Sequence, residues 1–316
     1  MITLEKLTKI FGTRPAVESL DLTVPKGEIF GLLGHNGAGK STTIGMLLGQ
    51  VWPTSGSVLV CGHDVTRNRH DALRKVGAIF ETPIFYDYLS GRRNLEILAT
   101  YTAPTSAQRI REVAEWVGLG GREDSKVRTY SHGMRARLAL AQALLPGPEL
   151  LILDEPTNGL DPEGIHEMRE TIRRLHRNLG LTILLSSHLL SEVEQLCSRI
   201  AVIHGGRKVF DGTLAETRAS APKLLLDVDR FAEAAALLLA EGWITGSDPT
   251  GHVLLAPGRN VSGIVRRLVE AGFNVEGAQR EPQTLEDFYL SVVKSARLSQ
   301  GTPSTPPPIA ASIRPS

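Results

Sequence analysis

Short apolar runs alternate with amphipathic stretches along residues 1 to about 215, a pattern typical of α/β domains. Four runs are so uniformly apolar that they predict strands of a sheet covered on both faces. They span residues 28–33, 150–153, 182–186 and 200–203. Gly205 and Gly206 follow the last run and precede residues 208–211, so they predict a tight hairpin turn.

A second, smaller α/β pattern covers residues 222–294. The pattern predicts strands at 224–228, 243–245, 252–255 and 273–275, and helices at 231–241 and 261–271. This βαββαβ order predicts a ferredoxin-like unit. Leu285, Phe288 and Val292 then recur at helical spacing and predict a last helix over residues 284–294.

The end of the chain, residues 296–316, is rich in Ser, Thr, Pro and Ala. Such a composition buries too little apolar surface to offset the entropy lost on ordering, so it predicts a disordered tail. The sequence therefore divides into three parts, 1–215, 222–294 and 296–316.

Composition narrows the class of protein. Of 316 residues, 41% are hydrophobic and 22% charged, which excludes a mostly disordered or fibrous chain. The formal net charge of +1 argues against broad electrostatic binding to nucleic acid or to an anionic membrane.

Cys61 and Cys197 have no metal-ligand spacing, and we expect two buried, reduced thiols. Residues 1–6 do not form a signal peptide, and no run of 18 apolar residues occurs, so a role at a membrane requires spanning helices from another chain.

Residues 34–41, GHNGAGKS, fit the phosphate-binding pattern G-x-x-x-x-G-K-[ST]. Glycines let backbone N–H groups approach a phosphate, Lys40 reaches the β- and γ-phosphates, and the Ser41 hydroxyl binds Mg²⁺. An apolar strand precedes the loop, and a helix after it points its N-terminal dipole at the anion. A Gly-rich turn without a ligand is the alternative. The expected nucleotide-binding residues here are Gly34, His35, Asn36, Gly37, Ala38, Gly39, Lys40, Ser41 and Thr42.

Two adjacent acids, Asp154 and Glu155, end the apolar run 150–153. Ligands of α/β sheets bind at the carboxyl ends of strands. We expect Asp154 to hold Mg²⁺, usually through water, and Glu155 to orient and deprotonate the attacking water. Strands that end in acids are common, and the phosphate loop upstream is what favours this interpretation over a surface carboxylate.

A third motif, residues 130–135 (YSHGMR), resembles the signature motif of the ATP-binding subunits of ABC transporters. The resemblance runs from Ile2 to about Thr213. It implies an ATP-hydrolysing P-loop NTPase cassette over 1–215, with ATP and Mg²⁺ as cofactors. Such a cassette has a RecA-like core sheet, an antiparallel β subdomain and a helical subdomain, and here a small α/β accessory domain over 222–294 would follow.

By the same resemblance, Ser131 and the N–H of Gly133 bind the γ-phosphate held by the opposite subunit of a dimer. His132 departs from the usual glycine of this motif. The alternative for Ser131 is the N-cap of an ordinary helix, whose face would carry residues 138, 141 and 145. That alternative does not explain why Ser131 lies about twenty residues before the Asp154–Glu155 strand.

Four more positions resemble functional residues of the family. Phe11 matches the aromatic residue that stacks on adenine, with a core phenylalanine as the alternative. Asp161 matches a residue that bridges to the partner subunit, although it could also cap the helix that Pro162 opens. His188 matches the switch histidine that closes on the γ-phosphate, with a core histidine as the alternative. Glu81 stands where a glutamine usually links Mg²⁺ to the membrane subunit, and its oxygen could still bind the metal or its water.

Residues 81–86 and 89–95 resemble most the bacitracin- and lantibiotic-type exporter ATPases, and drug-export subunits often end in a motif like residues 284–288. This resemblance implies the ATPase subunit of an exporter of a drug, antibiotic or peptide, with a link to antibiotic resistance. Two copies, or two paired cassette subunits, would enclose two ATP molecules head to tail. They would drive a separate polytopic permease through residues 80–93, from the cytoplasmic face of the membrane and without nucleic acid.

Two other functions stay open from the sequence. A non-transport ABC ATPase, such as a DNA-repair or chromosome-organising enzyme, would typically show paired cassettes or a long coiled coil, and neither is present. An ATP-sensing interaction protein with little hydrolysis is supported only by Glu81 and His132. Glu155 and His188 argue against it.

Overall fold

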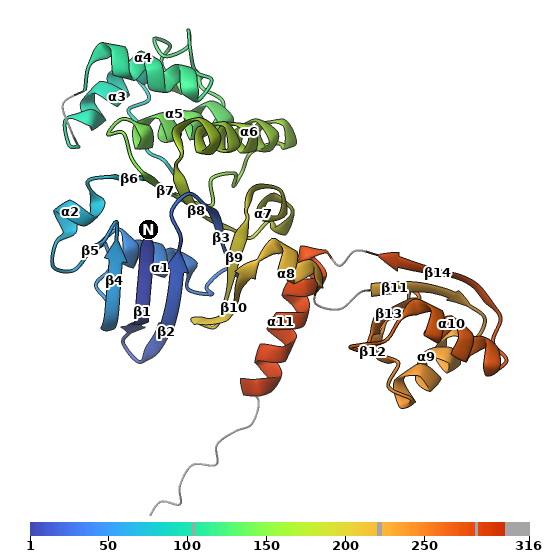
Figure 1. Cartoon of the computed structure of the whole chain (residues 1–316). Helices are drawn as coiled ribbons and strands as arrows, with labels where there is room; N and C mark the ends of the chain where they lie inside the picture. The colour runs from blue at the N-terminus through green and yellow to red at the C-terminus, as the bar shows by residue number, and fades with distance from the viewer. Residues whose placement is uncertain (103–104, 220–222, 282–283, 301–316) are drawn as a thin grey trace, which may run out of the picture.

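The structure is a computed structural model that describes residues 1–102, 105–219, 223–281 and 284–300 (Figure 1). Within these residues the strands form three sheets. Two sheets belong to the first 215 residues, and the third lies in the C-terminal part, to the right in Figure 1.

The central sheet has six strands in the order β10-β9-β3-β8-β7-β6. They are β3 (Ile29–Leu33), β6 (Val76–Ile79), β7 (Leu150–Asp154), β8 (Thr182–Ser187), β9 (Arg199–His204) and β10 (Arg207–Thr213). β9, β3, β8, β7 and β6 pair in parallel, whereas β10 pairs antiparallel with β9 after the predicted glycine turn. The four buried strands and the hairpin predicted from the sequence are therefore confirmed.

Both faces of the central sheet are covered, which explains its uniformly apolar strands. Alternate residues of β3 enter different cores: Phe30 and Leu32 lie in one, and Ile29 and Leu33 in the other. The Phe30 side is closed by α1 (Lys40–Leu47) and by a four-stranded antiparallel sheet, of order β2-β1-β4-β5. The strands of that sheet are β1 (Ile2–Phe11), β2 (Arg14–Val24), β4 (Ser55–Val60) and β5 (His63–Asp64).

The other face packs against helices that gather at the top of Figure 1. They include α3 (Gly91–Ala99), α4 (Ala107–Trp116), α5 (His132–Leu144) and α6 (Pro162–Leu179). α7 (Leu190–Leu196) covers the same face beside β3 and β8. Two short helices are connections between sheets: α2 (Arg69–Leu73) lies between β5 and β6, and α8 (Leu214–Ala219) follows β10 and precedes the C-terminal part. The residues expected on one face of α5, Leu138, Ala141 and Leu145, are buried.

The C-terminal sheet has the antiparallel order β12-β13-β11-β14 and its own apolar core. Its elements are β11 (Lys223–Val228), α9 (Phe231–Ala240), β12 (Ile244–Ser247), β13 (His252–Leu255), α10 (Val261–Glu270) and β14 (Val275–Glu281). The first strand lies between the third and fourth, as in a ferredoxin-like βαββαβ unit. The predicted order of elements is therefore present, with boundaries shifted by a few residues.

The last helix, α11 (Leu285–Gln300), returns to the first part of the chain and packs on α7, α8, β9 and β10 (Figure 1). It is longer than the predicted helix and includes residues 296–300, which the sequence assigned to the tail. The rest of that tail, 301–316, lies outside the described residues. None of the helices in the described ranges is both long and apolar enough to cross a membrane.

Candidate nucleotide-binding site

The phosphate loop connects β3 to α1, so the carboxyl end of a central strand leads directly into a helix N-terminus. The loop depends on its glycines. A Cβ at Gly34 would lie 2.6 Å from the carbonyl oxygen of Ile203, and one at Gly39 would lie 2.6 Å from that of Ala16. Gly39 also adopts a φ of 111°, which side chains disfavour. A residue with a Cβ atom at position 34 or 39 would therefore not fit unless the backbone moved.

A hollow of about 410 Å³ opens beside the loop. It gathers predicted residues from four separate segments, since Glu81 follows β6, Glu155 follows β7 and His188 follows β8. Parallel strands have their carboxyl ends at the same edge of the sheet, which explains why these three residues lie at one hollow. The predicted residues that line the hollow are His35, Asn36, Gly37, Gly39, Lys40, Ser41, Thr42, Glu81, Glu155 and His188.

Lys40 and Glu155 form the charged centre of this hollow. The Nζ atom of Lys40 donates to the carbonyl oxygen of Gly34 at 2.8 Å and lies 3.2 Å from Oε1 of Glu155. Oε2 of Glu155 accepts from the backbone N–H of His188 at 3.2 Å and lies 2.8 Å from its Nδ1. A cation, a carboxylate and an imidazole therefore meet at the centre of the hollow.

Ser186 holds the two acids in place. Its hydroxyl donates to Oδ1 of Asp154 at 2.6 Å and accepts from the backbone N–H of Glu155 at 3.0 Å. Glu155 has a φ of 50°, an uncommon value for a residue other than glycine. The sequence analysis missed Ser186. No sequence signal links it to the acids, because the link depends on the register, which places Ser186 of β8 directly opposite Asp154 of β7.

A second polar pair lies behind the acids. The Thr157 hydroxyl donates to Oε2 of Glu192, a carboxylate on α7 that is only 4% exposed. Burial raises the pKa of the Glu192 carboxyl, while the Thr157 hydrogen bond and the nearby Arg169 act to lower it. The sequence analysis also missed this pair, because nothing in the pattern shows that α7 faces the loop after β7.

The donor set suits magnesium. Ser41 and Glu81 line the hollow, and Asp154 lies buried below it at the end of β7. A hydroxyl and carboxylates are the hard oxygen ligands that Mg²⁺ takes, together with water and substrate phosphates. Among the described residues no three His, Cys, Asp or Glu side chains cluster as a metal cage. Glu81 is also tied to the next loop, because Nδ2 of Asn158 donates to its Oε1 at 2.7 Å.

Ser131, Gly133 and Asp161 lie apart from the phosphate loop and line a different hollow of about 480 Å³. Ser131 is exposed and caps α5 by accepting from the N–H of Met134, and Asp161 caps α6 by accepting from that of Gly164. Both local alternatives from the sequence are therefore realised, and both side chains still face solvent. Within one chain the structure does not bring these residues to the phosphate loop.

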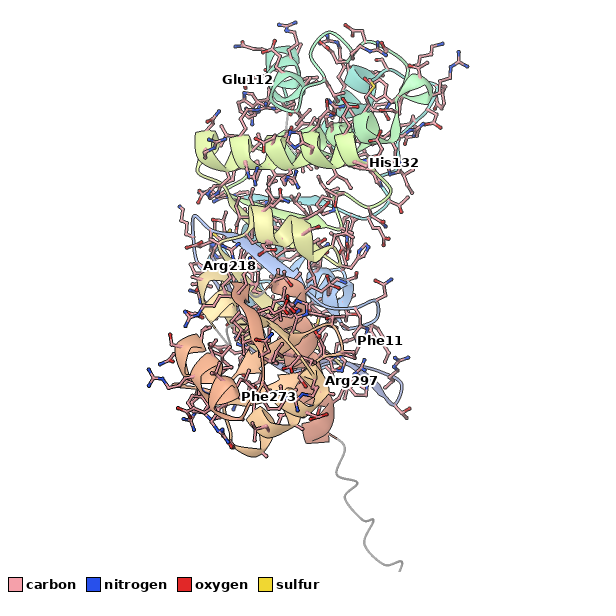
Figure 2. All side chains as sticks on the ribbon, turned by 90° about the vertical axis from the view of Figure 1, so that its right-hand side faces the viewer. Phe11, Glu112, His132, Arg218, Phe273 and Arg297 are labelled. Atoms are coloured by element: carbon pink, nitrogen blue, oxygen red, sulfur yellow. The ribbon has the colours of Figure 1, made fainter. Side chains whose placement is uncertain are left out.

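The structure shows the surroundings of Phe11 and His132, which the sequence alone did not decide. Phe11 is 53% exposed at the end of β1, with Nζ of Lys9 4.9 Å from its ring centre, so it is not a core phenylalanine (Figure 2). His132 lies elsewhere, at the start of α5, and its Nε2 is 3.3 Å from the carbonyl oxygen of Asn158 (Figure 2). The residue that departs from the signature motif thus contacts the loop after the acids.

The fold and this edge of the sheet define a P-loop nucleoside triphosphatase, and comparison with known proteins narrows the class. A family model described as ABC transporter matches residues 17–158. The bacitracin transport ATP-binding protein BcrA of Bacillus licheniformis is 39% identical over 296 residues, which are 91% of this chain and 95% of that protein. The daunorubicin resistance ATP-binding protein DrrA3 of Streptomyces coeruleorubidus is 36% identical over 308 residues, 94% and 96% of the two chains.

A solved structure of an ATP-binding subunit of an ABC transporter is 30% identical and has a TM-score of 0.61, over 69% of this chain and 92% of that one. The chain belongs to the ATP-binding subunits of ABC transporters. It is therefore an ATPase whose hydrolysis is coupled to transport, and the predicted fold, family and enzyme class are confirmed.

Proposed function

We propose that two copies of this chain, or this chain and a paired cassette, bind two ATP molecules head to tail and hydrolyse them. The observation that carries the proposal is the separation of two exposed half-sites. The phosphate loop lines one hollow, and Ser131, Gly133 and Asp161 line another. A second subunit would bring its own Ser131 and helix N-terminus to the γ-phosphate held by Lys40.

In this arrangement the described residues have separate tasks. The backbone of residues 34–42 and Lys40 hold the phosphates, and Phe11 offers an exposed ring for adenine stacking. Ser41, Asp154 and Glu81 would hold Mg²⁺, which would supply charge neutralisation for the phosphates. Glu155 orients and deprotonates the attacking water, and His188 contacts the γ-phosphate. Catalysis rests on position and charge rather than on a covalent step.

A membrane permease is the partner that the surface supports best. Exposed apolar and aromatic side chains follow β6, on both sides of Glu81 in the sequence. They are Phe80, Ile84, Tyr86 and Tyr88, and Ile84 is 85% exposed. A separate polytopic subunit docked there would place this chain on the cytoplasmic face of the membrane. ATP-driven closure would then move the permease helices through residues 80–93.

The cargo belongs to the class that the relatives' names describe. These names refer to bacitracin transport and to daunorubicin resistance, and both relatives match along more than nine-tenths of this chain. We therefore propose export of a drug, antibiotic or peptide. The direct test is expression with its permease and measurement of resistance to these two compounds.

The test of the ATPase mechanism is a phosphate-release assay with purified chain, with and without Mg²⁺, beside size-exclusion chromatography with light scattering. We expect Mg²⁺-dependent release and an ATP-dependent shift from monomer to dimer. ATP binding without release would instead support the sensor function. Release with a strictly monomeric chain at every ATP concentration would contradict the shared site.

A further inference from the structure

The last helix is part of the ATP-binding core, although the C-terminal unit, from β11 to β14, precedes it in the chain. Leu285, Phe288 and Val293 of α11 are buried, and the first two belong to the same core cluster as β3, β7 and β8. The Phe288 ring meets that of Phe210 edge to face, with centroids 4.6 Å apart at 75°. Packing of this kind fixes the axis and rotation of α11 against β9 and β10.

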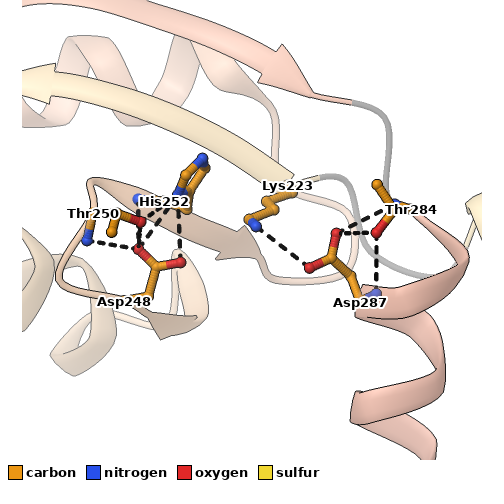
Figure 3. A network of polar contacts seen from close by, with 6 residues as sticks. All are labelled: Lys223, Asp248, Thr250, His252, Thr284 and Asp287. Carbon is orange, nitrogen blue, oxygen red and sulfur yellow. Dashed lines mark hydrogen bonds and ion pairs between the residues drawn. The ribbon is translucent and has the colours of Figure 1, made fainter.

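The start of α11 is fixed on its other side to the C-terminal unit (Figure 3). The Thr284 hydroxyl accepts from the backbone N–H of Asp287 at 3.1 Å, and the Asp287 carboxylate accepts from the Thr284 hydroxyl and N–H at 2.7 and 3.3 Å. This is a reciprocal cap of the first turn. Nζ of Lys223, at the start of β11, lies 3.4 Å from the other oxygen of Asp287. The helix therefore connects the C-terminal sheet to the ATP-binding core.

One side chain of α11 reaches the nucleotide-binding loops. Tyr289 follows Phe288 and is half-buried at a small hollow of about 320 Å³. Burial raises the pKa of its phenol, and the backbone N–H of His35 acts in the opposite direction. The other residues of this hollow come from the phosphate loop and from the loop that carries the switch histidine: Gly34, His35, Asn36, Ser187, His188 and Leu190.

These two loops carry residues that the proposed function places around the phosphates of ATP. The first supplies the phosphate cradle, and the second carries His188 and continues into α7, which also packs on α11. Tyr289 is the α11 residue that lines the hollow between them. The His35 ring also lies edge to face with that of His204 on β9, with centroids 5.2 Å apart. Residues of both β9 and α11 therefore lie beside the start of the phosphate loop.

We propose that Tyr289 is a positioning residue for ATP binding: from the C-terminal helix it holds the start of the phosphate loop against the switch-histidine loop. The C-terminal unit then acts on the nucleotide site through Lys223, Asp287 and Tyr289, and a change in its position alters the affinity for ATP. This role rests on the ATP binding of the family and adds a residue outside the cassette to it.

The test compares Tyr289→Phe and Tyr289→Ala with Leu290→Ala, all in the full-length chain. Leu290 is the next residue of the same helix and is 58% exposed, so its truncation controls for changes in α11 itself. The readouts are the Kd for the fluorescent analogue mant-ATP with Mg²⁺ and the split between KM and kcat for ATP. Midpoints of thermal unfolding report on docking of α11.

We expect Tyr289→Ala to raise both the Kd for mant-ATP and the KM for ATP by about tenfold, and Tyr289→Phe by about two- to fivefold, with kcat less affected. Leu290→Ala should match the wild type. Should Tyr289→Ala fail to fold, Tyr289→Phe still tests the proposal, because this variant keeps the ring and removes only the hydroxyl group.

The proposal is overturned if both Tyr289 variants stay within twofold of Leu290→Ala in Kd and KM. It is also overturned if their losses appear only as a lower unfolding midpoint, since a merely structural role predicts that result. Failure of the ATPase mechanism itself is recognised separately, because wild-type chain would then release no phosphate.

Discussion

Nζ of Lys40 lies 3.2 Å from Oε1 of Glu155, so the phosphate-binding cation and the proposed base form a buried ion pair. The two side chains are about 6% and 10% exposed. A γ-phosphate that enters the hollow therefore competes with Glu155 for the same ammonium group. Binding of ATP would release the Glu155 carboxylate from Lys40 and leave it free to accept a proton from water.

Replacement of Glu155 by glutamine separates binding from hydrolysis. Glu155→Gln is expected to retain ATP binding and to lower phosphate release by about 100-fold or more, because the amide cannot take a proton. ATP-bound dimers should then accumulate and be visible by light scattering. Glu112→Gln, on the exposed face of α4, is the control. Undiminished turnover of Glu155→Gln would remove Glu155 from the role of base.

Lys40→Ala tests the phosphate cradle. Loss of the buried ammonium should raise the Kd for ATP by about tenfold or more, since a charge-assisted hydrogen bond to phosphate is lost. Isothermal titration calorimetry measures this directly. Lys26→Ala removes a lysine whose side chain is 70% exposed and should leave the affinity unchanged. Equal affinities for the two variants would contradict the assignment of the cradle.

Ser186→Ala tests the support of the two acids. The variant leaves Oδ1 of Asp154 and the N–H of Glu155 without a partner, which should cost about 1–3 kcal/mol of stability in urea unfolding. We also expect a higher Mg²⁺ concentration for half-maximal hydrolysis, because Asp154 is less well oriented. Ser57→Ala, whose hydroxyl bonds Glu5 at the surface, is the control. Wild-type stability and Mg²⁺ dependence would exclude this supporting role.

Glu192 predicts a pH dependence. Burial raises the pKa of its carboxyl, and the Glu155 charge acts in the same direction, whereas Thr157, Arg169 and His188 oppose them. The folded pKa is above the unfolded one, so the stability contribution is complete below about pH 4.3 and is lost as pH rises through the folded pKa.

Glu192→Gln keeps an acceptor for the Thr157 hydroxyl and removes the ionisation. Its unfolding midpoint should equal that of the wild type near pH 4 and exceed it increasingly at higher pH, up to a plateau above the folded pKa. Differential scanning fluorimetry over pH 4–8 measures the difference. A difference that is constant or shrinks with rising pH would show that Glu192 is not held in this way.

Phe288→Ala tests whether α11 belongs to the ATP-binding core. Phe288 is 4% exposed, and its truncation should cost about 3–5 kcal/mol through the cavity it leaves. Hydrogen exchange should then rise in α8 and β10 as well as in α11, because these elements share the contact. Exchange that rises only within α11 would mean that the helix is not part of the core.

The two parts of the site differ in how well the sequence predicts them. The phosphate loop is a contiguous segment whose backbone is set by its own glycines, so GHNGAGKS identifies Lys40 and Ser41 without tertiary information. Glu81, Glu155 and His188 come from three other strand ends, and their convergence could be expected because parallel strands share one edge. Ser186 could not be assigned to the acids before the register between β7 and β8 was known.

By itself the sequence determined four central strands, the order of elements in the C-terminal unit, the phosphate loop and the family, because each depends on local periodicity or on a contiguous motif. Only the tertiary structure decided that α11 leaves the C-terminal unit and returns to the ATP-binding core, and that Tyr289 lines a hollow together with His35. The spacing of Leu285 and Phe288 shows that a helix has an apolar face. It cannot show which core covers that face, because the hydrophobic effect is not directional and either unit could have buried it.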